Sequence, residues 1–239
     1  MVCKMSTRPI SMHVPPLLLR ASTRRLSHPA IMRGSMKPRR RNPKARVVAR
    51  AALPTSFGKF RIFAVRGAGR ADEAVAIVHG DLRRAKAPLV RVHSQCLTGD
   101  VFTSQRCDCR AQLEFSLRKI AKERAGVLLY LPQEGRGIGL INKVKAYELQ
   151  DAGLDTVEAN RRLGFAADSR DYEFAAAALK ALGIRAVRLL SNNPDKVAQL
   201  EKSGVRVVER IPCRPRTSGL SRAYLRTKRE KLGHILAGI

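Results

Sequence analysis

Three cysteines close together in the sequence carry the clearest chemical signal. Cys96 follows a predicted strand, and Cys107 and Cys109 stand at the start of a predicted helix. The single residue between the last two does not match the knuckle of a structural zinc ribbon. Three thiolates without a fourth ligand nearby suit a catalytic Zn²⁺, which keeps one position for water and lowers the pKa of that water to about 7. The spacing predicts one zinc ion per chain, in a hydrolytic enzyme that acts on a small anionic substrate.

Other interpretations of these cysteines stay open at the level of sequence. They could be ordinary buried thiols, or a closed zinc site whose fourth ligand is His93 or Cys213. A Cys-x-Cys redox pair is a third interpretation. It is less favoured because Asp108 lies between the two cysteines and a third cysteine lies upstream.

A glycine-rich loop, Gln133-Glu-Gly-Arg-Gly-Ile-Gly-Leu140, follows a predicted buried strand and opens a predicted helix. Backbone N–H groups and the helix dipole can hold an anion at such a place, and Arg136 adds a bidentate donor. The loop is neither the Walker pattern nor the dinucleotide fingerprint. A tight strand-to-helix turn without a ligand is therefore the alternative.

Three further polar residues stand close to predicted helices. Tyr147 lies about two turns along the helix that the loop opens, and Asp168 and Arg170 lie at the start of a later one. Asp168 as a helix N-cap and Arg170 as a surface cation are the ordinary interpretations. Near a zinc-bound water, a carboxylate can relay protons and an arginine can stabilise phosphoryl charge.

Alternating strands and helices must position these residues. Strand patterns cover 60–65, 74–78, 89–93, 127–131, 186–190 and 205–208. Helical spacing of apolar residues follows Cys109, and further helices are predicted at 139–152, 156–164, 170–182, 195–203 and 221–236. Asp155 and Glu158 have the spacing of a capping box. The order of elements predicts a mixed α/β domain.

Positive charge is concentrated at the amino-terminal end. Of the 47 Lys and Arg residues, 13 lie in residues 1–50, which contain no acid; the remaining 34 against 19 acids give residues 51–239 a net charge of +15. That excess favours anionic ligands. Residues 1–50 are predicted to be a largely disordered basic extension, and 51–239 the catalytic domain. The extension resembles an organelle transit peptide, or the product of a reading frame that starts too early, before Met32 or Met36.

Composition also limits the class of protein. No apolar run approaches the roughly 20 residues of a membrane-spanning helix, so no membrane association is expected. Five cysteines without a signal peptide favour a reducing compartment, and we expect a cytoplasmic protein, with organelle targeting by residues 1–50 left open. A nucleic-acid-binding module is the rival that the net charge of +28 suggests, but seven Phe, four Tyr and no Trp give few stacking platforms.

Four motifs taken together resemble GTP cyclohydrolase II. They are Arg91-Val-His-Ser-Gln-Cys-Leu-Thr-Gly-Asp100, Arg106-Cys-Asp-Cys-Arg-Ala-Gln112, the 133–140 loop, and Gly164-Phe-Ala-Ala-Asp-Ser-Arg-Asp171. The resemblance covers about residues 53–234, with the motifs in the same order and at similar spacing. It implies a single domain with a mixed sheet and flanking helices, and a homodimer.

The resemblance also implies a reaction: hydrolysis of a cyclic amidine in GTP, giving 2,5-diamino-6-(5-phospho-ribosylamino)pyrimidin-4(3H)-one, formate and diphosphate, the first step of riboflavin biosynthesis. Cys96, Cys107 and Cys109 would bind the zinc ion, whose water attacks C8 of guanine. Arg170 would act at the α-phosphate and Asp168 as proton acceptor. Because the pKa of arginine exceeds 12, a charge-stabilising role for Arg170 is better founded than a covalent one.

The remaining matching positions would contact GTP, with Mg²⁺ on the triphosphate and Tyr147 beside the reacting ring. They are Arg91, Val92, His93, Ser94, Gln95, Gln112, Glu134, Gly135, Arg136, Thr156, Ser191 and Lys196. This chain departs from the family pattern in three places: Gln95 replaces the usual Glu, Arg110 replaces the usual Gly, and residues 213–219 replace an Asn-rich loop. A catalytically inactive zinc-binding homologue is therefore a second rival.

Overall fold

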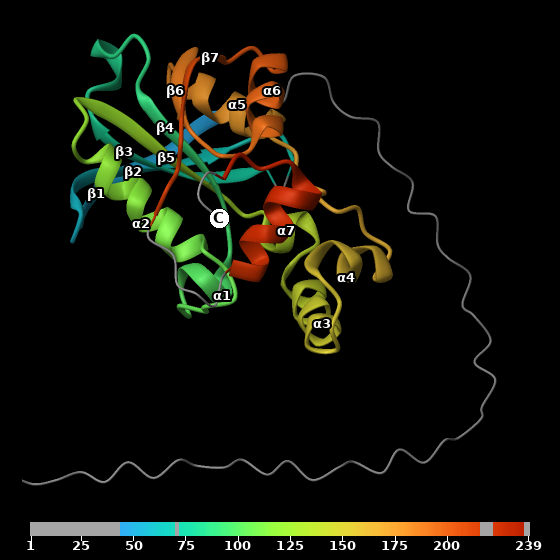
Figure 1. Cartoon of the computed structure of the whole chain (residues 1–239). Coiled ribbons are helices and arrows are strands. Elements are labelled where there is room, and N and C mark those ends of the chain that lie inside the picture. The colour runs from blue at the N-terminus through green and yellow to red at the C-terminus, as the bar shows by residue number, and fades with distance from the viewer. Residues whose placement is uncertain (1–43, 70–71, 216–221, 237–239) are drawn as a thin grey trace, which may run out of the picture. The chain divides into compact units, whose positions relative to one another are not determined.

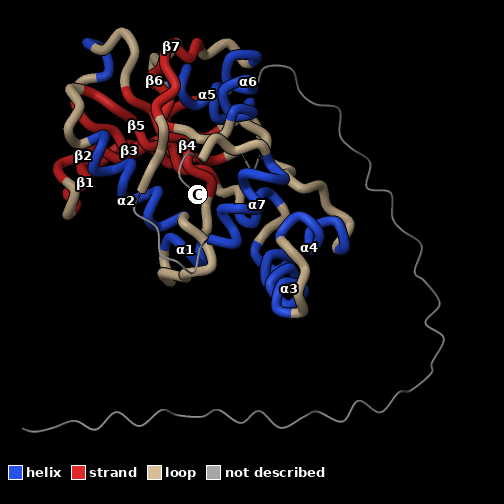
Figure 2. The backbone as a smooth tube through the Cα atoms, viewed as in Figure 1, coloured by secondary structure: helices blue, strands red, loops and turns tan. Residues whose placement is uncertain are grey.

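The chain from Arg46 onward forms one seven-stranded mixed sheet with helices on both faces (Figures 1 and 2). The computed structural model describes residues 44–69, 72–215 and 222–236. The strands are β1 (Arg46–Thr55), β2 (Gly58–Arg66), β3 (Glu73–Gly80), β4 (Leu89–Ser94), β5 (Ala125–Leu131), β6 (Ala186–Leu190) and β7 (Arg206–Ile211). Their order in the sheet is β1-β2-β3-β5-β4-β6-β7. The expected mixed α/β class is confirmed.

The sheet has an antiparallel half and a parallel half. Strands β1, β2, β3 and β5 pair antiparallel, whereas β5, β4, β6 and β7 run parallel. In β5, Val127, Leu129 and Leu131 face one apolar core, and Leu128 faces the other. Burial on both faces explains why β5 reads as a continuous apolar run rather than an alternating one.

The helices divide between the two faces of the sheet and its edge. They are α1 (Leu97–Asp100), α2 (Cys109–Ile120), α3 (Leu140–Asp151), α4 (Thr156–Arg162), α5 (Glu173–Ala181), α6 (Pro194–Lys202) and α7 (Arg222–Leu232), with short 3₁₀ turns η1 (Leu82–Arg84) and η2 (Glu134–Gly137). Helix α2 packs against β4 and β5 on one face, and α5 and α6 lie together on the other. Helices α3, α4 and α7 gather at one end of the parallel strands (Figure 1).

Helix ends follow local chemistry. The predicted capping box is confirmed, because Asp155 accepts from Glu158 N and the Glu158 side chain accepts from Asp155 N. Helix α5 begins at Glu173, three residues later than 170, since Asp168 caps the turn at Arg170 and not a helix. Strand β1 was not expected, and its first five residues lie before the predicted boundary at 51. Residues 1–43 of the predicted extension lie outside the described residues.

The carboxyl ends of β4, β5 and β6 meet at one edge of the sheet. Cys96 follows β4, the glycine-rich loop follows β5, and Ser191 follows β6. Side chains at this edge of parallel strands converge, which is why ligands of open α/β sheets bind there. The parallel half of the sheet thus brings the motifs of the sequence together.

Candidate active site

The three cysteines predicted to bind metal meet at this edge. Their sulfur atoms lie within 4.8 Å of one another, and Cys96 Sγ and Cys107 Sγ are 3.7 Å apart. Tetrahedral zinc with Zn–S distances of about 2.3 Å sets sulfur atoms about 3.8 Å apart. Soft thiolates in this arrangement fit a zinc ion. Among the described residues, no other group of three His, Cys, Asp or Glu side chains comes this close together.

The three sulfur atoms are close enough to shift one another's pKa. Hydrogen bonds from Cys107 and Cys109 hold the pKa of Cys96 far below its usual value. The hydrogen bond from Cys109 alone would lower the pKa of Cys107, but the neighbouring Cys96 sulfur and burial outweigh it and raise that pKa to about 11. The crowded sulfurs therefore do not ionise together by themselves, and a metal ion would supply the missing positive charge.

The two possible fourth ligands, His93 and Cys213, lie outside the three-sulfur group. Buried His93 bonds Asp100 through Nε2, at 3.1 Å, and stacks on Tyr130. Buried Cys213 packs in the apolar core beneath α2, and its backbone N–H donates to Asn192. Neither belongs to the three-sulfur group in the part of the chain that the structure describes. Among the described residues, the three sulfurs therefore gather without a fourth His, Cys, Asp or Glu side chain, as the predicted open site requires.

Gly99 makes room for the three sulfurs. A Cβ atom at this position would lie 2.9 Å from Cys107 Sγ and 3.1 Å from Cys96 Sγ. The neighbouring Asp100 carboxylate accepts from Cys96 N at 3.0 Å. This hydrogen bond links Cys96, which precedes the first residue of α1, to the last residue of the same helix. Sequence analysis quoted Gly99 within a motif and assigned it no role, because close approach of a backbone to a side-chain cluster leaves no periodic signal.

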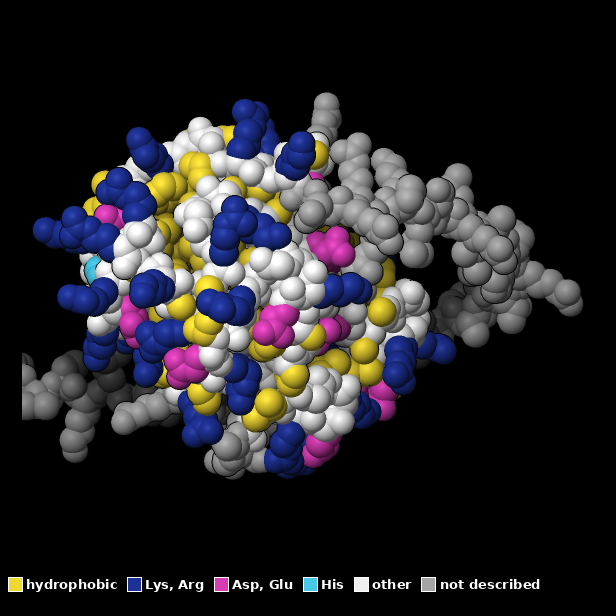
Figure 3. Space-filling view, turned by 90° about the horizontal axis from the view of Figure 1, so that it is seen from above, with side chains coloured by type: hydrophobic (Ala, Val, Ile, Leu, Met, Phe, Trp, Pro, Cys, Tyr) yellow, Lys and Arg dark blue, Asp and Glu magenta, His cyan; other side chains and the backbone are white. Residues whose placement is uncertain are grey.

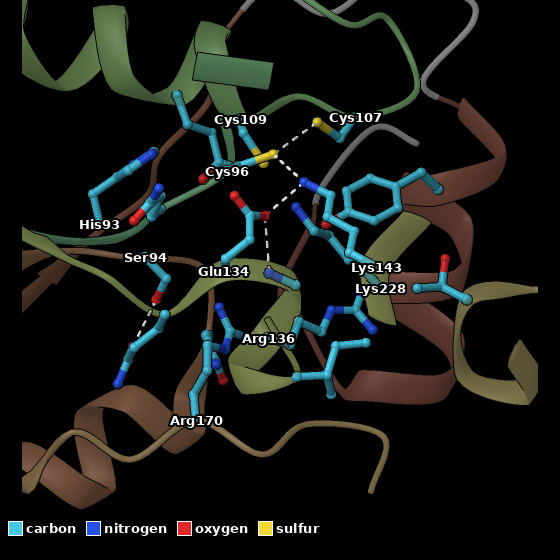
Figure 4. A pocket seen from close by; sticks show the side chains of 18 of the residues that line it. His93, Ser94, Cys96, Cys107, Cys109, Glu134, Arg136, Lys143, Arg170 and Lys228 are labelled. Carbon is cyan, nitrogen blue, oxygen red and sulfur yellow. Dashed lines mark hydrogen bonds and ion pairs between the residues drawn. The ribbon is translucent and has the colours of Figure 1, made fainter. Parts of the chain in front are cut away.

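Glu134 and Lys143 form a buried ion pair beside the sulfurs (Figure 4). Lys143 Nζ lies 2.7 Å from Glu134 Oε1 and 3.1 Å from Cys96 Sγ. The other carboxylate oxygen of Glu134 accepts from Leu97 N at 2.6 Å. Glu134 was predicted to contact GTP, and here both of its oxygens have protein partners; Lys143 was not predicted.

The glycine-rich loop contains two consecutive residues with left-handed backbone conformation. Gly135 and Arg136 take φ values of 60° and 62°. This conformation is less favourable for Arg136 because it carries a side chain. Both terminal nitrogens of the Arg136 guanidinium are buried without a protein partner. Unpartnered buried donors at the wall of a cavity point to an anionic ligand.

Cations crowd the same cavity. Lys196 is buried, donates to Val92 O at 2.8 Å, and lies 4.9 Å from the centre of the Tyr172 ring. Burial, together with the charges of Arg91 and Arg170, holds the pKa of Lys196 well below its usual value. An anion bound among these groups would offset both the loss of hydration and the repulsion between the cations.

Asp168 and Arg170 are paired with each other. Arg170 Nε donates to both carboxylate oxygens of Asp168, at 2.9 and 3.1 Å, and Arg170 N donates to one of them at 3.0 Å. Burial alone would raise the pKa of Asp168, but these hydrogen bonds and the arginine charge outweigh it and lower the pKa. Arg170 lines the cavity and Asp168 does not. The geometry makes Asp168 a weak base and a support for Arg170.

Tyr147 lines the cavity together with the three cysteines. Its hydroxyl is 3.0 Å from Thr98 Oγ1, which in turn lies 3.7 Å from Cys96 Sγ. Arg106 stacks over the ring at 4.8 Å and bonds Asp151 on the same helix. Burial is the largest cause that raises the pKa of Tyr147, so the phenol stays protonated at neutral pH.

One cavity gathers most of the predicted site residues. Sixteen of the eighteen line it, and Val92 and Asp168 are the two that do not. Of these sixteen, those not yet described are Ser94, Gln95, Gln112, Thr156 and Ser191. Lys143, Lys228 and His234 line the same cavity and were not predicted as site residues.

Lys228 links α7 to the segment that carries Cys107 and Cys109. Its ammonium lies 2.7 Å from Asp108 Oδ1, and both side chains are buried. Gln112 bonds the other oxygen of Asp108, and Arg91 bonds Gln112. This chain of polar contacts fixes the residue between Cys107 and Cys109 to the strand that carries Arg91.

Comparison with known proteins agrees with the site. The sequence profile of GTP cyclohydrolase II matches residues 45–212. The chain belongs to the GTP cyclohydrolase II family. It is 49% identical over 191 residues to the GTP cyclohydrolase-2 of Buchnera aphidicola, which covers 80% of this chain and 98% of that protein. It is 51% identical over 197 residues to the riboflavin biosynthesis protein RibBA of Chlorobium phaeovibrioides, covering 81% of this chain and 48% of that one.

Family membership puts the chain's length in context. A second RibBA, from Aquifex aeolicus, is 51% identical over 197 residues, again 48% of its length. The chain therefore spans about half the length of the RibBA relatives that it matches, and nearly all of the Buchnera protein. In the described residues, no helix has the length and apolar character needed to span a membrane.

Proposed function

We propose that this chain hydrolyses GTP to 2,5-diamino-6-(5-phospho-ribosylamino)pyrimidin-4(3H)-one, formate and diphosphate, as GTP cyclohydrolase II does in riboflavin biosynthesis. The observation that carries the proposal is a single cavity lined by a three-sulfur group and by buried cations. Hydrolysis at guanine C8 needs a metal ion on the sulfur group, and loss of diphosphate needs the buried cations. Family membership supports the same reaction.

Cys96, Cys107 and Cys109 would hold one zinc ion. Zinc bound there supplies a Lewis acid and an activated water. The chain's own residues prepare the position: Gly99 leaves space for the sulfurs, and Asp100 fixes Cys96 through its backbone. Tyr147, protonated and held by Thr98, can donate a hydrogen bond to the base beside the sulfurs.

Arg136, Lys196 and Arg170 would bind the triphosphate, with Mg²⁺ on its outer oxygens. The free guanidinium nitrogens of Arg136 can form a bidentate contact with phosphate oxygens. Arg170, oriented by Asp168, would stabilise negative charge as diphosphate leaves. An electrostatic role suits a guanidinium whose pKa is held above its usual value, because nucleophilic attack would require loss of a proton.

One assay tests the reaction. Purified chain with Zn²⁺, Mg²⁺ and GTP should release formate and diphosphate in equal amounts. Cys109→Ser should lose formate release, whereas Cys213→Ala, a change at a buried cysteine outside the group, should retain it. Formate without diphosphate would refute the role of Arg170. Neither product from the wild-type chain would leave the inactive zinc-binding homologue as the better interpretation.

The amino-terminal extension offers a test against the nucleic-acid-binding rival. On the face drawn in Figure 3, Lys and Arg are dispersed among uncharged side chains and do not form one stripe. The truncated chain should begin at residue 44, because β1 begins at Arg46 and pairs with β2. Such a chain should turn over GTP at the full-length rate if the catalytic domain lies after the extension. The homodimer and the cytoplasmic location stay predictions.

A further inference from the structure

A buried ammonium from α3 touches the three-sulfur group. Lys143 Nζ lies 3.1 Å from Cys96 Sγ, and its side chain is 10% exposed. Figure 4 shows the ammonium between the sulfur and Glu134, with dashed lines to both. Lys143 comes from an element that carries no metal ligand, so its approach to Cys96 is a feature of the tertiary structure.

An ion pair with Glu134 alone would not require this contact. A lysine buried to this degree needs a partner for its charge, and Glu134 Oε1 at 2.7 Å provides one. The second contact is directed at a ligand sulfur. Glu134 is itself held in place, because its oxygens accept from Leu97 N at 2.6 Å and from Gly135 N at 2.9 Å. The lysine therefore has little freedom to leave the sulfur.

Charge explains what the contact does. Three thiolates around a divalent zinc ion carry a net charge of −1 in a partly buried site. The backbone N–H groups of Leu97 and Gly135 donate to Glu134, and the ammonium lies 3.1 Å from Cys96 Sγ. An N–H···S hydrogen bond also withdraws electron density from the sulfur, which keeps the metal a stronger Lewis acid.

We propose that Lys143, held by Glu134, is a positioning residue that offsets the negative charge of the thiolate set and fixes Cys96 for the metal. The inference rests on the proposed zinc site. Groups that orient a metal ligand in this way commonly change metal affinity 10- to 100-fold when they are removed. Lys145, an exposed lysine two residues along the same helix, is a matched control.

The experiment compares zinc affinity among full-length variants. Wild type, Lys143→Met, Lys143→Arg and Lys145→Met are titrated with zinc against a chromogenic chelator near neutral pH. Lys143→Met should bind zinc about 10- to 100-fold more weakly. Lys143→Arg should stay nearer to wild type because it keeps the charge, and Lys145→Met should equal wild type. Equal affinity in wild type and Lys143→Met overturns the proposal.

Cobalt substitution separates charge from structure. The thiolate-to-cobalt charge-transfer band should shift to lower energy in Lys143→Met, because the sulfur loses its hydrogen bond. An unshifted band would make Lys143 a packing residue and overturn the proposal. Should Lys143→Met not fold, Glu134→Gln provides the same two readouts, with a smaller loss expected. A wild-type chain that binds neither zinc nor cobalt would instead refute the metal site itself.

Discussion

Gly99→Ala is the substitution that tests the metal site most directly. It adds one methyl group on α1 and removes none of the three cysteines. The new Cβ would lie 2.9 Å from Cys107 Sγ, 3.1 Å from Cys96 Sγ and 3.1 Å from Cys109 Cβ. These three nearest atoms all belong to predicted ligands. The effect should therefore fall on metal binding, with little effect on the rest of the fold.

The size of the effect follows from these distances. Ordinary contact is about 3.5 Å or more, so Cys107 Sγ would have to move by roughly 0.6 Å. Metal–ligand distances tolerate about 0.2 Å. Overpacking of this kind costs about 1–3 kcal/mol. If the strain appears only in the metal-bound state, zinc affinity falls about 5- to 150-fold.

Zinc affinity measured by chelator competition, together with formate release from GTP, provides the assay. Val101→Ala is the control, since Val101 follows α1 and is 59% exposed. It should change neither zinc affinity nor formate release. Gly99→Ala with wild-type zinc affinity would refute the reasoning, because the methyl group would then have been accommodated without moving a sulfur.

Three further predictions address the charges and the metal. Asp168→Asn should lower the free energy of unfolding by about 2 kcal/mol between about pH 5 and 8. Because Arg170 lowers the pKa of Asp168, this difference should shrink below about pH 4, where acid protonates the wild-type carboxyl. A difference in urea midpoint that does not change with pH would contradict this. Lys196→Met should weaken GTP binding, measured by calorimetry, about tenfold or more. It should change the stability of the ligand-free protein, measured by urea unfolding, by no more than about 1 kcal/mol, because removal of a buried charge offsets the lost hydrogen bond. Removal of metal with a chelator should abolish formate release and added Zn²⁺ should restore it, whereas full activity of metal-free protein would exclude a metal-dependent reaction.

Strong local patterns explain what the sequence could predict. The apolar run at β5, the helical spacing of α2 and the capping box at Asp155 each depend on neighbouring residues, and all three were found. Strand β1 was missed because it is an edge strand with mostly exposed side chains, so its residues carry little apolar alternation. The start of α5 was set too early because Asp168 has the chemistry of a helix cap but closes a turn around Arg170.

Contacts between distant segments lay beyond the sequence. Lys143 reaches Cys96 across 47 positions, and Lys228 reaches Asp108 across 120. No periodicity reports such pairs, because they depend on how α3 and α7 pack at the sheet edge. The motifs located the cavity, but the residues that set its electrostatics came from helices whose sequence suggests only a charged surface.

Gln95 and Arg110 show why distance along the chain is a poor guide to influence on a site. Each stands next to a predicted metal ligand and, by the resemblance to GTP cyclohydrolase II, differs from the residue expected there. The Arg110 side chain turns away: Nε bonds Glu114 at 2.6 Å and Nη1 bonds Asp100 O at 2.7 Å, at the end of α1. Its charge is matched outside the cavity. Gln95 follows β4 and lines the cavity wall, so the loss of a carboxylate there bears directly on the proposed chemistry.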